Sequence, residues 1–112
     1  MALKSLVAVL IGGCALLVAA PVSADETGLA GIHSFSRESG RTCFADHWHT
    51  WSGGVQKTKP AALAAAVKGW TSFTDMEYGS DWAHFSRAAA KKISCSKSSD
   101  GFGCTVEARP CK

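Results

Sequence analysis

The sequence lacks the short motifs by which most small enzymes can be recognised. Its 112 residues contain no Gly-x-Ser-x-Gly nucleophile elbow, no His-Glu-x-x-His zinc motif and no glycine-rich phosphate loop. Carboxylates that could share one site are missing too, because Asp75 and Glu77 are expected to lie in solvent near a helix end. These absences argue against an enzyme, with a small hydrolase or isomerase left as the alternative, and we predict no cofactor.

A strong excess of one charge is also absent. The chain has 12 lysines and arginines and 9 aspartates and glutamates. If Lys4 is lost with a cleaved leader, 11 basic residues remain against 9 acidic ones, a net charge of +2. So mild a charge does not support electrostatic capture of nucleic acid. We therefore expect no nucleic-acid partner.

The one long apolar run stands at the start of the chain, from Leu6 to Ala20. Lys4 precedes it, and small residues at 22–24 follow it, which together predict a secretory signal peptide over residues 1–24. An uncleaved anchor or a lipid anchor on Cys14 are the alternatives. Because no later segment is long enough to span a bilayer, we expect a periplasmic or secreted protein without membrane insertion after cleavage.

Four of the five cysteines lie beyond this leader, and none of them has the Cys-x2-Cys spacing of a zinc site. An even number in a short exported chain indicates disulfides. Three pairings are possible. The turn sequence Ser98–Gly101 between two short runs favours a hairpin that places Cys95 opposite Cys104. Cys43 would then pair with Cys111.

The order of elements predicts a small α+β domain. Residues 25–40 are expected to be a flexible lead-in, and residues 41–112 a single domain. A first strand is expected over 41–51, ended by Ser52-Gly53-Gly54. Two helices and the hairpin follow, which gives a β-α-α-β-β order with both helices on one face of a short three-stranded antiparallel sheet.

The first helix should begin at Thr58, which can cap it, with Pro60 in the first turn. Alanines fill its start, and one apolar stripe runs along it: Leu63, Ala66, Val67, Trp70 and Phe73. The second helix is expected from Ser80 onward, with a buried stripe of Trp82, Phe85, Ala89 and Ile93.

Two histidines and one tryptophan are the candidate binding residues. His47 and His49 stand two apart, which on a strand places both imidazoles on one face, an arrangement suited to a metal. A third ligand is hard to find, because His84 falls among positive charges, Asp46 points the other way and His33 lies in the lead-in. Ordinary structural histidines are the alternative.

The four tryptophans divide into two groups. Trp70 and Trp82 lie on apolar stripes and are expected in the core. Trp48 and Trp51 fall on opposite faces of the strand. Trp51, beside two glycines, is the better candidate for ligand contact.

A pattern of four parts extends over residues 43–111. The parts are Cys43-Phe44-Ala45-Asp46-His47-x-His49, an alanine-rich helix with Trp70, Tyr78-Gly79-x-x-Trp82 and a closing Ala108-Arg109-Pro110-Cys111. This pattern resembles a group of small exported bacterial proteins of unknown function that share Trp…Tyr-Gly…Cys…Cys…Ala-Arg-Pro-Cys. The resemblance implies export, disulfides and the α+β order. It implies no activity or catalytic residue.

Two functions follow as hypotheses. The first is a disulfide-stabilised binding module for a protein or small ligand, which it contacts near His47, His49 and Trp51. The second is a metal-binding periplasmic protein that uses His47 and His49.

Overall fold

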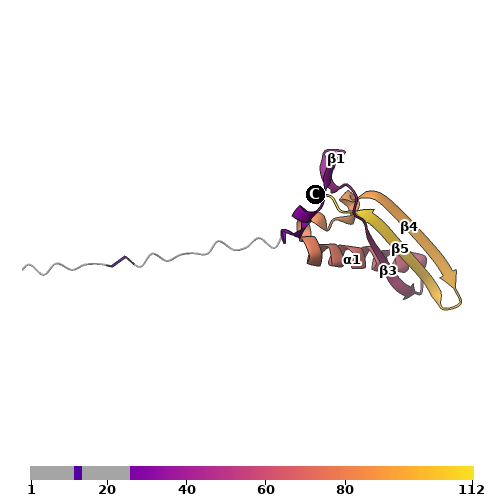
Figure 1. Ribbon diagram of the computed structural model, residues 1–112. Helices are drawn as coiled ribbons and strands as arrows, with labels where there is room; N and C mark the ends of the chain where they lie inside the picture. Colours follow the sequence, from indigo (N-terminus) through magenta and orange to yellow (C-terminus); the bar gives the residue numbers. More distant parts are fainter. Residues whose placement is uncertain (1–11, 14–25) are drawn as a thin grey trace, which may run out of the picture.

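The computed structural model describes residues 12–13 and 26–112 (Figure 1). The predicted signal peptide, its cleavage site and the alternative lipid anchor on Cys14 lie outside the described residues. The described chain is an α+β domain, as predicted, but with one α-helix where two were expected. That helix packs against a three-stranded antiparallel sheet, and a separate two-stranded sheet lies beyond one end of it.

Helix α1 spans Lys59–Tyr78 and begins as the sequence predicts. The Thr58 side chain accepts a hydrogen bond from the Ala61 N–H at 3.2 Å, and Pro60 occupies the first turn. The buried residues recur every fourth position, which places one continuous stripe against the sheet. They are Ala62, Ala66, Trp70, Thr74 and Tyr78.

The predicted second helix is wrong. Residues 80–87 form only two short 3-10 turns, η2 over Ser80–Trp82 and η3 over Phe85–Arg87, and strand β4 then spans Ala89–Ser98. The alanine- and lysine-rich start of β4 has high helix propensity, but pairing with the neighbouring strand overrides it. Ile93, expected on a buried helical stripe, is instead half exposed on a strand.

The larger sheet has the order β3-β5-β4, with β5 spanning Gly101–Arg109. A tight turn at Ser99-Asp100 joins β4 to β5, so the hairpin is longer and its loop shorter than expected. Alternate residues of β5, Cys104, Val106 and Ala108, are buried and form the main core with the α1 stripe.

The predicted single strand over 41–51 is two strands separated by a bend: β2, Arg41–Phe44, and β3, His49–Gln56. Gly53 and Gly54 do not end β3, which continues through an irregularity between Ser52 and Val55. Gly53 is needed there because a Cβ would come within 2.4 Å of the Ala66 backbone nitrogen. The glycines therefore allow helix and sheet to approach closely.

The expected flexible lead-in contains regular structure. A 3-10 turn, η1, spans Leu29–Ile32, and strand β1, Phe35–Glu38, pairs with β2. The physical reason is local pairing across the tight turn at Ser39-Gly40, where both residues have positive φ. The chain just before η1 lies against the C-terminal end of α1, because the Thr27 N–H donates to the Tyr78 carbonyl at 3.1 Å.

Both disulfides have the pairing derived from the sequence. Cys95–Cys104 links two residues that face each other across the hairpin, and Cys43–Cys111 joins β2 to the C-terminal end. The second bridge is fully buried. Such bonds are typical of proteins of oxidising compartments.

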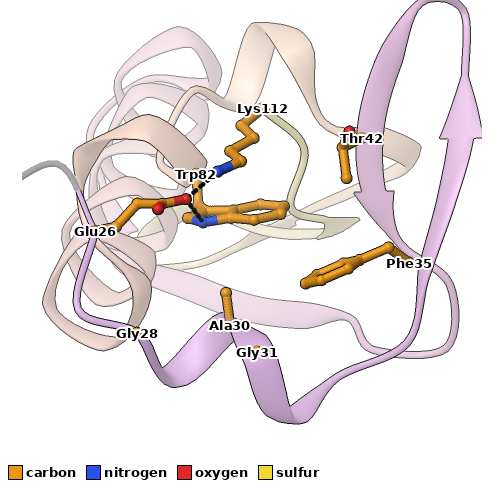
Figure 2. Close-up of a pocket in the computed structure, with 8 residues that line it drawn as sticks. All are labelled: Glu26, Gly28, Ala30, Gly31, Phe35, Thr42, Trp82 and Lys112. Carbon is orange, nitrogen blue, oxygen red and sulfur yellow. Dashed lines mark hydrogen bonds and ion pairs between the residues drawn. The ribbon is translucent and has the colours of Figure 1, made fainter.

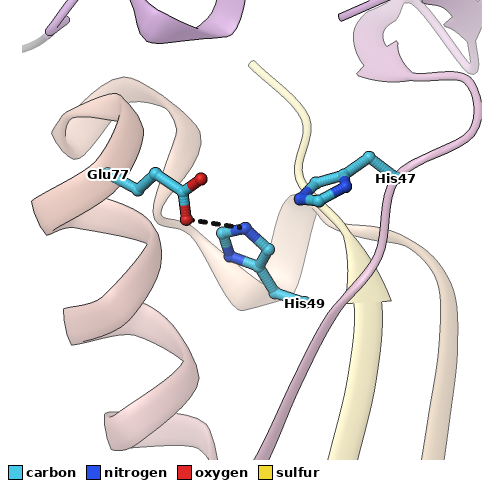
Figure 3. A group of neighbouring side chains, drawn as sticks. All are labelled: His47, His49 and Glu77. Carbon is cyan, nitrogen blue, oxygen red and sulfur yellow. Dashed lines mark ion pairs between the residues drawn. The ribbon is translucent and has the colours of Figure 1, made fainter.

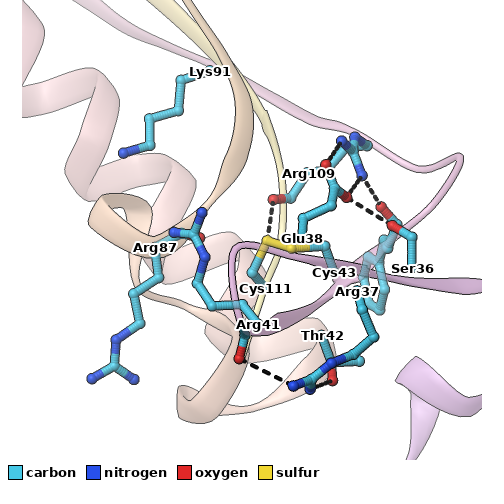
Figure 4. The surroundings of a disulfide bond; sticks show 12 residues. Ser36, Arg37, Glu38, Arg41, Thr42, Cys43, Arg87, Lys91, Arg109 and Cys111 are labelled. Atoms are coloured by element: carbon cyan, nitrogen blue, oxygen red, sulfur yellow. Dashed lines mark hydrogen bonds and ion pairs between the residues drawn. A yellow bond between two sulfur atoms is a disulfide. The ribbon is translucent and has the colours of Figure 1, made fainter.

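An ion pair lies close to the buried bridge (Figure 4). Arg109 donates two hydrogen bonds of 2.6 Å to the Glu38 carboxylate and thereby joins β5 to β1. Hydrogen bonds from Arg109 and then Ser36 lower the pKa of Glu38 to about 2. The bridge and the ion pair together hold the small sheet against the end of the larger one.

Candidate metal site

His47, His49 and Glu77 come together where β3 begins and α1 ends (Figure 3). His47 lies in the connection between β2 and β3, His49 is the first residue of β3, and Glu77 is the penultimate residue of α1. The three donor atoms all lie within 4.8 Å of one another. Glu77, which we had expected in solvent and whose side chain is 33% exposed, is therefore the candidate third ligand that the histidine pair lacked in the sequence.

His49 is almost completely buried, with 3% of its side chain exposed, and its tautomer is fixed by a chain of hydrogen bonds. Its Nδ1 lies 2.8 Å from Thr74 Oγ1, and that hydroxyl donates its only proton to the Trp70 carbonyl at 2.7 Å. Thr74 can therefore only accept from His49, so Nδ1 carries the ring proton. Nε2 keeps its lone pair.

The environment keeps this imidazole neutral. Burial lowers the pKa of His49 to about 4, although the Glu77 carboxylate opposes that shift. The pKa of His47 is lowered as well, first by burial and then by the neighbouring His33. Near neutral pH both rings are therefore in the unprotonated form that binds metals.

The Nε2 atom of His49 is buried without a hydrogen-bond partner among the described residues. It points at Glu77 Oε2, 3.4 Å away. Because a neutral imidazole nitrogen and a carboxylate oxygen are both acceptors, neither can satisfy the other. Unsatisfied buried acceptors are rare and costly, and a cation between these two atoms would satisfy both.

The spacing fits a tetrahedral ion. Donor atoms on a tetrahedral zinc ion with bonds of about 2.1 Å lie about 3.4 Å apart, and the centres of two imidazole ligands lie about 5 Å apart. The observed values are 3.4 Å between His49 Nε2 and Glu77 Oε2, and 5.1 Å between the His47 and His49 ring centres. The donor atom of His47 is the one that has to move closer to the other two to complete the three-ligand set.

Aromatic rings lie against the two histidines of the site. Phe73 lies 4.7 Å from His49 between ring centres, and Tyr78 stacks on His49 at 5.2 Å. The ring centre of Phe44 lies 6.0 Å from that of His47, in an edge-on arrangement. Such an apolar shell strengthens electrostatic interactions with a bound ion.

Trp51 stands apart from the two histidines. Its indole lies over Gly69 on α1, where a Cβ would come within 1.9 Å of the indole nitrogen, and it stacks on Phe73 at 5.7 Å. Trp51 is 40% exposed. The structure thus groups His47 with His49, whereas Trp51 contacts Phe73 and is not part of the converging donors.

The other tryptophans and His84 differ in their burial. Trp70 and Trp82 are fully buried, so their expected core position is confirmed. Trp48 is exposed and lies under the Arg109 guanidinium at 5.5 Å. His84 is exposed and lies just before η3, not on a helix.

A cavity of about 280 Å³ lies elsewhere, between η1, β1 and the C-terminus (Figure 2). Its charged groups already pair with one another, because Glu26 accepts from the Trp82 indole N–H and forms an ion pair with Lys112. Phe35 stacks on Trp82 at 5.5 Å across it. No histidine lines this cavity, so it is a separate feature from the metal site.

Comparison with known proteins adds no assignment: no family model, no curated protein and no solved structure matches the chain. In the part of the chain that the structure describes, no helix combines the length and apolar character needed to cross a bilayer.

Proposed function

We propose that the protein is an exported, disulfide-bonded module that binds one divalent transition-metal ion through His47, His49 and Glu77. Zn²⁺ is the ion that suits this set best. The observation that carries the proposal is the buried Nε2 of His49, which has no hydrogen-bond partner among the described residues and lies 3.4 Å from the Glu77 carboxylate.

The chemistry of the donors favours this class of ion. Two imidazole nitrogens and one carboxylate oxygen suit Zn²⁺, with Cu²⁺ and Ni²⁺ as competitors of the same class. The four cysteines among the described residues are all in disulfides, so they offer no thiolate to a soft ion such as Cu(I). Thr74 supplies the outer hydrogen bond that metal-binding histidines commonly have.

Export supports a binding role in the periplasm or outside the cell. Residues 1–24 predict a signal peptide, and the two disulfides agree with an oxidising compartment. We also propose that the chain belongs to the small exported bacterial proteins with the Ala108-Arg109-Pro110-Cys111 ending. Binding of a protein or small ligand stays a prediction, and burial of His49 means that such a partner would contact His47 and Trp51 instead.

Zinc titration of the oxidised protein tests the proposal. Isothermal calorimetry of residues 25–112 should give one Zn²⁺ per chain. Glu77→Gln, which removes the charge and keeps the shape, should weaken binding at least about tenfold. Asp75→Asn is the matched control, because Asp75 is an exposed carboxylate at the same helix end.

A second pair separates the histidines. His47→Gln should weaken binding at least as much as Glu77→Gln does, whereas His84→Gln, at an exposed histidine, should leave it unchanged. Wild-type protein that takes up no zinc, or equal binding by Glu77→Gln and Asp75→Asn, would overturn the proposed function.

A further inference from the structure

A tetrahedral ion takes four donors, and three are assigned above. We propose that His33 is the fourth ligand, so that a bound ion ties the N-terminal segment Leu29–Glu38 to the end of α1. This inference rests on the proposed function.

His33 is the nearest further imidazole. It follows η1 directly and is half buried, with its ring centre 4.4 Å from that of His47 and 5.5 Å from that of Tyr78. Its donor atoms are not yet among those that converge within 4.8 Å. Coordination therefore requires a change in the orientation of the His33 ring.

One hydrogen bond of His33 decides which of its nitrogens is left for a metal. Its Nε2 lies 2.9 Å from the Tyr78 hydroxyl. That nitrogen is engaged with Tyr78, so Nδ1 is the one left to coordinate, an arrangement like that of His49, where one nitrogen bonds to a hydroxyl and the other faces the site.

The segment that carries His33 already lies against Glu77 and Tyr78. The Thr27 hydroxyl donates to the Glu77 carbonyl at 2.6 Å, and the Thr27 N–H donates to the Tyr78 carbonyl. Ala45, just before His47, donates to the Ser34 carbonyl at 2.9 Å. These bonds hold His33 on both sides, so coordination requires a side-chain rotation and little movement of the backbone.

Coordination by His33 makes two consequences measurable. A four-ligand site is closed, as structural zinc sites are, whereas three ligands leave one position for water. Binding would also slow amide exchange in η1 and β1, because opening of that segment would then require loss of a ligand.

Zinc X-ray absorption of the loaded wild-type protein counts the imidazoles directly. We expect three in the wild type and two in His33→Gln, with zinc affinity at least about tenfold weaker in the variant. Amide exchange at Leu29–Glu38 should slow on zinc binding in the wild type and in the His84→Gln control, but not in His33→Gln.

The two failures are distinguishable. Two imidazoles in the wild type, with equal affinity in His33→Gln, overturn the role of His33 and leave the three-ligand site intact. No zinc uptake by the wild type overturns both the site and this inference. Because the count is made on wild-type protein, it does not depend on the folding of the variant.

Discussion

His49 Nδ1 and Thr74 Oγ1 lie 2.8 Å apart, and this one hydrogen bond connects the core of the fold to the chemistry of the site. Thr74 belongs to the buried stripe of α1, and its own proton is committed to the Trp70 carbonyl. The Trp70 indole in turn donates to the His49 carbonyl at 3.0 Å. Helix and strand therefore fix the position and the tautomer of the imidazole before any ligand arrives.

Replacing Thr74 tests that connection. Thr74→Val keeps the shape but removes the acceptor for His49 Nδ1–H, so a buried donor loses its partner at a cost of about 1–3 kcal/mol. Zinc affinity should also fall, by about 10- to 100-fold. Thr74→Ser retains the hydroxyl and should restore most of the affinity. Urea unfolding and zinc titration measure the two effects, and full affinity in Thr74→Val would show that the hydrogen bond does not orient the ligand.

Acid should destabilise the metal-free protein in two steps. The folded pKa of His49, about 4, is below the ordinary value of 6.5, so the unfolded chain binds the proton first. The contribution of neutral His49 to the free energy of unfolding is fully present above pH 6.5. It is lost as the pH falls from about 6.5 to 4, and the loss amounts to up to about 3 kcal/mol. Glu38, with its pKa lowered from 4.5 to about 2, extends the loss below pH 4.5.

Protonation of the buried His49 imidazole causes the loss of stability between pH 6.5 and 4. His49→Gln should remove most of the dependence between pH 6.5 and 4, whereas His84→Gln should retain it. Chemical denaturation at several pH values measures the slopes. A wild-type curve that is flat over this range would contradict a neutral, buried His49.

The two disulfides should differ in their contribution to stability. Cys43–Cys111 closes a loop with a sequence separation of 68 and Cys95–Cys104 one of 9. Chain entropy gives about 4.4 kcal/mol for the first and about 2.7 for the second. Double alanine replacement of Cys43 and Cys111 should therefore lower the midpoint of thermal unfolding more than replacement of Cys95 and Cys104. The reverse order would indicate that the hairpin bridge maintains the sheet.

Gly53 should be the least replaceable glycine between β3 and α1. A Cβ there would lie 2.4 Å from the Ala66 backbone nitrogen, an atom that cannot move without shifting the helix. Gly53→Ala should destabilise the domain by about 1–3 kcal/mol. Gly31→Ala, with nothing within 4 Å of the new methyl group, is the control. Calorimetric unfolding compares the two, and equal midpoints would contradict the close approach of strand and helix.

The predictable parts of the fold are those with local causes. Thr58 and Pro60 mark the start of α1, and the turn at Ser99-Asp100 aligns Cys95 with Cys104. The start of β4 could not be predicted, because its alanines and lysines favour a helix. In the fold Ala89 and Lys92 pair instead with Arg109 and Glu107 of β5. Half of the site was predictable in the same way, from the two-residue spacing of His47 and His49.

Glu77 could not be assigned from the sequence, because it meets His49 only through the packing of α1 on β3. The one local signal was Thr74, a polar residue on the buried stripe of α1, with Glu77 three positions later on the same side. Once His49 takes Thr74 as its partner, Glu77 is the next side chain within reach. His33 was missed for a similar reason, since β1 forms only by pairing with β2.

Anomalous diffraction at the zinc absorption edge, from crystals of the oxidised protein grown with Zn²⁺, tests the central claim most directly. We predict one strong anomalous peak per chain, about 2.0–2.2 Å from His49 Nε2 and from donor atoms of His47 and Glu77. A peak only at other residues, or none while the protein is folded and oxidised, would contradict the account.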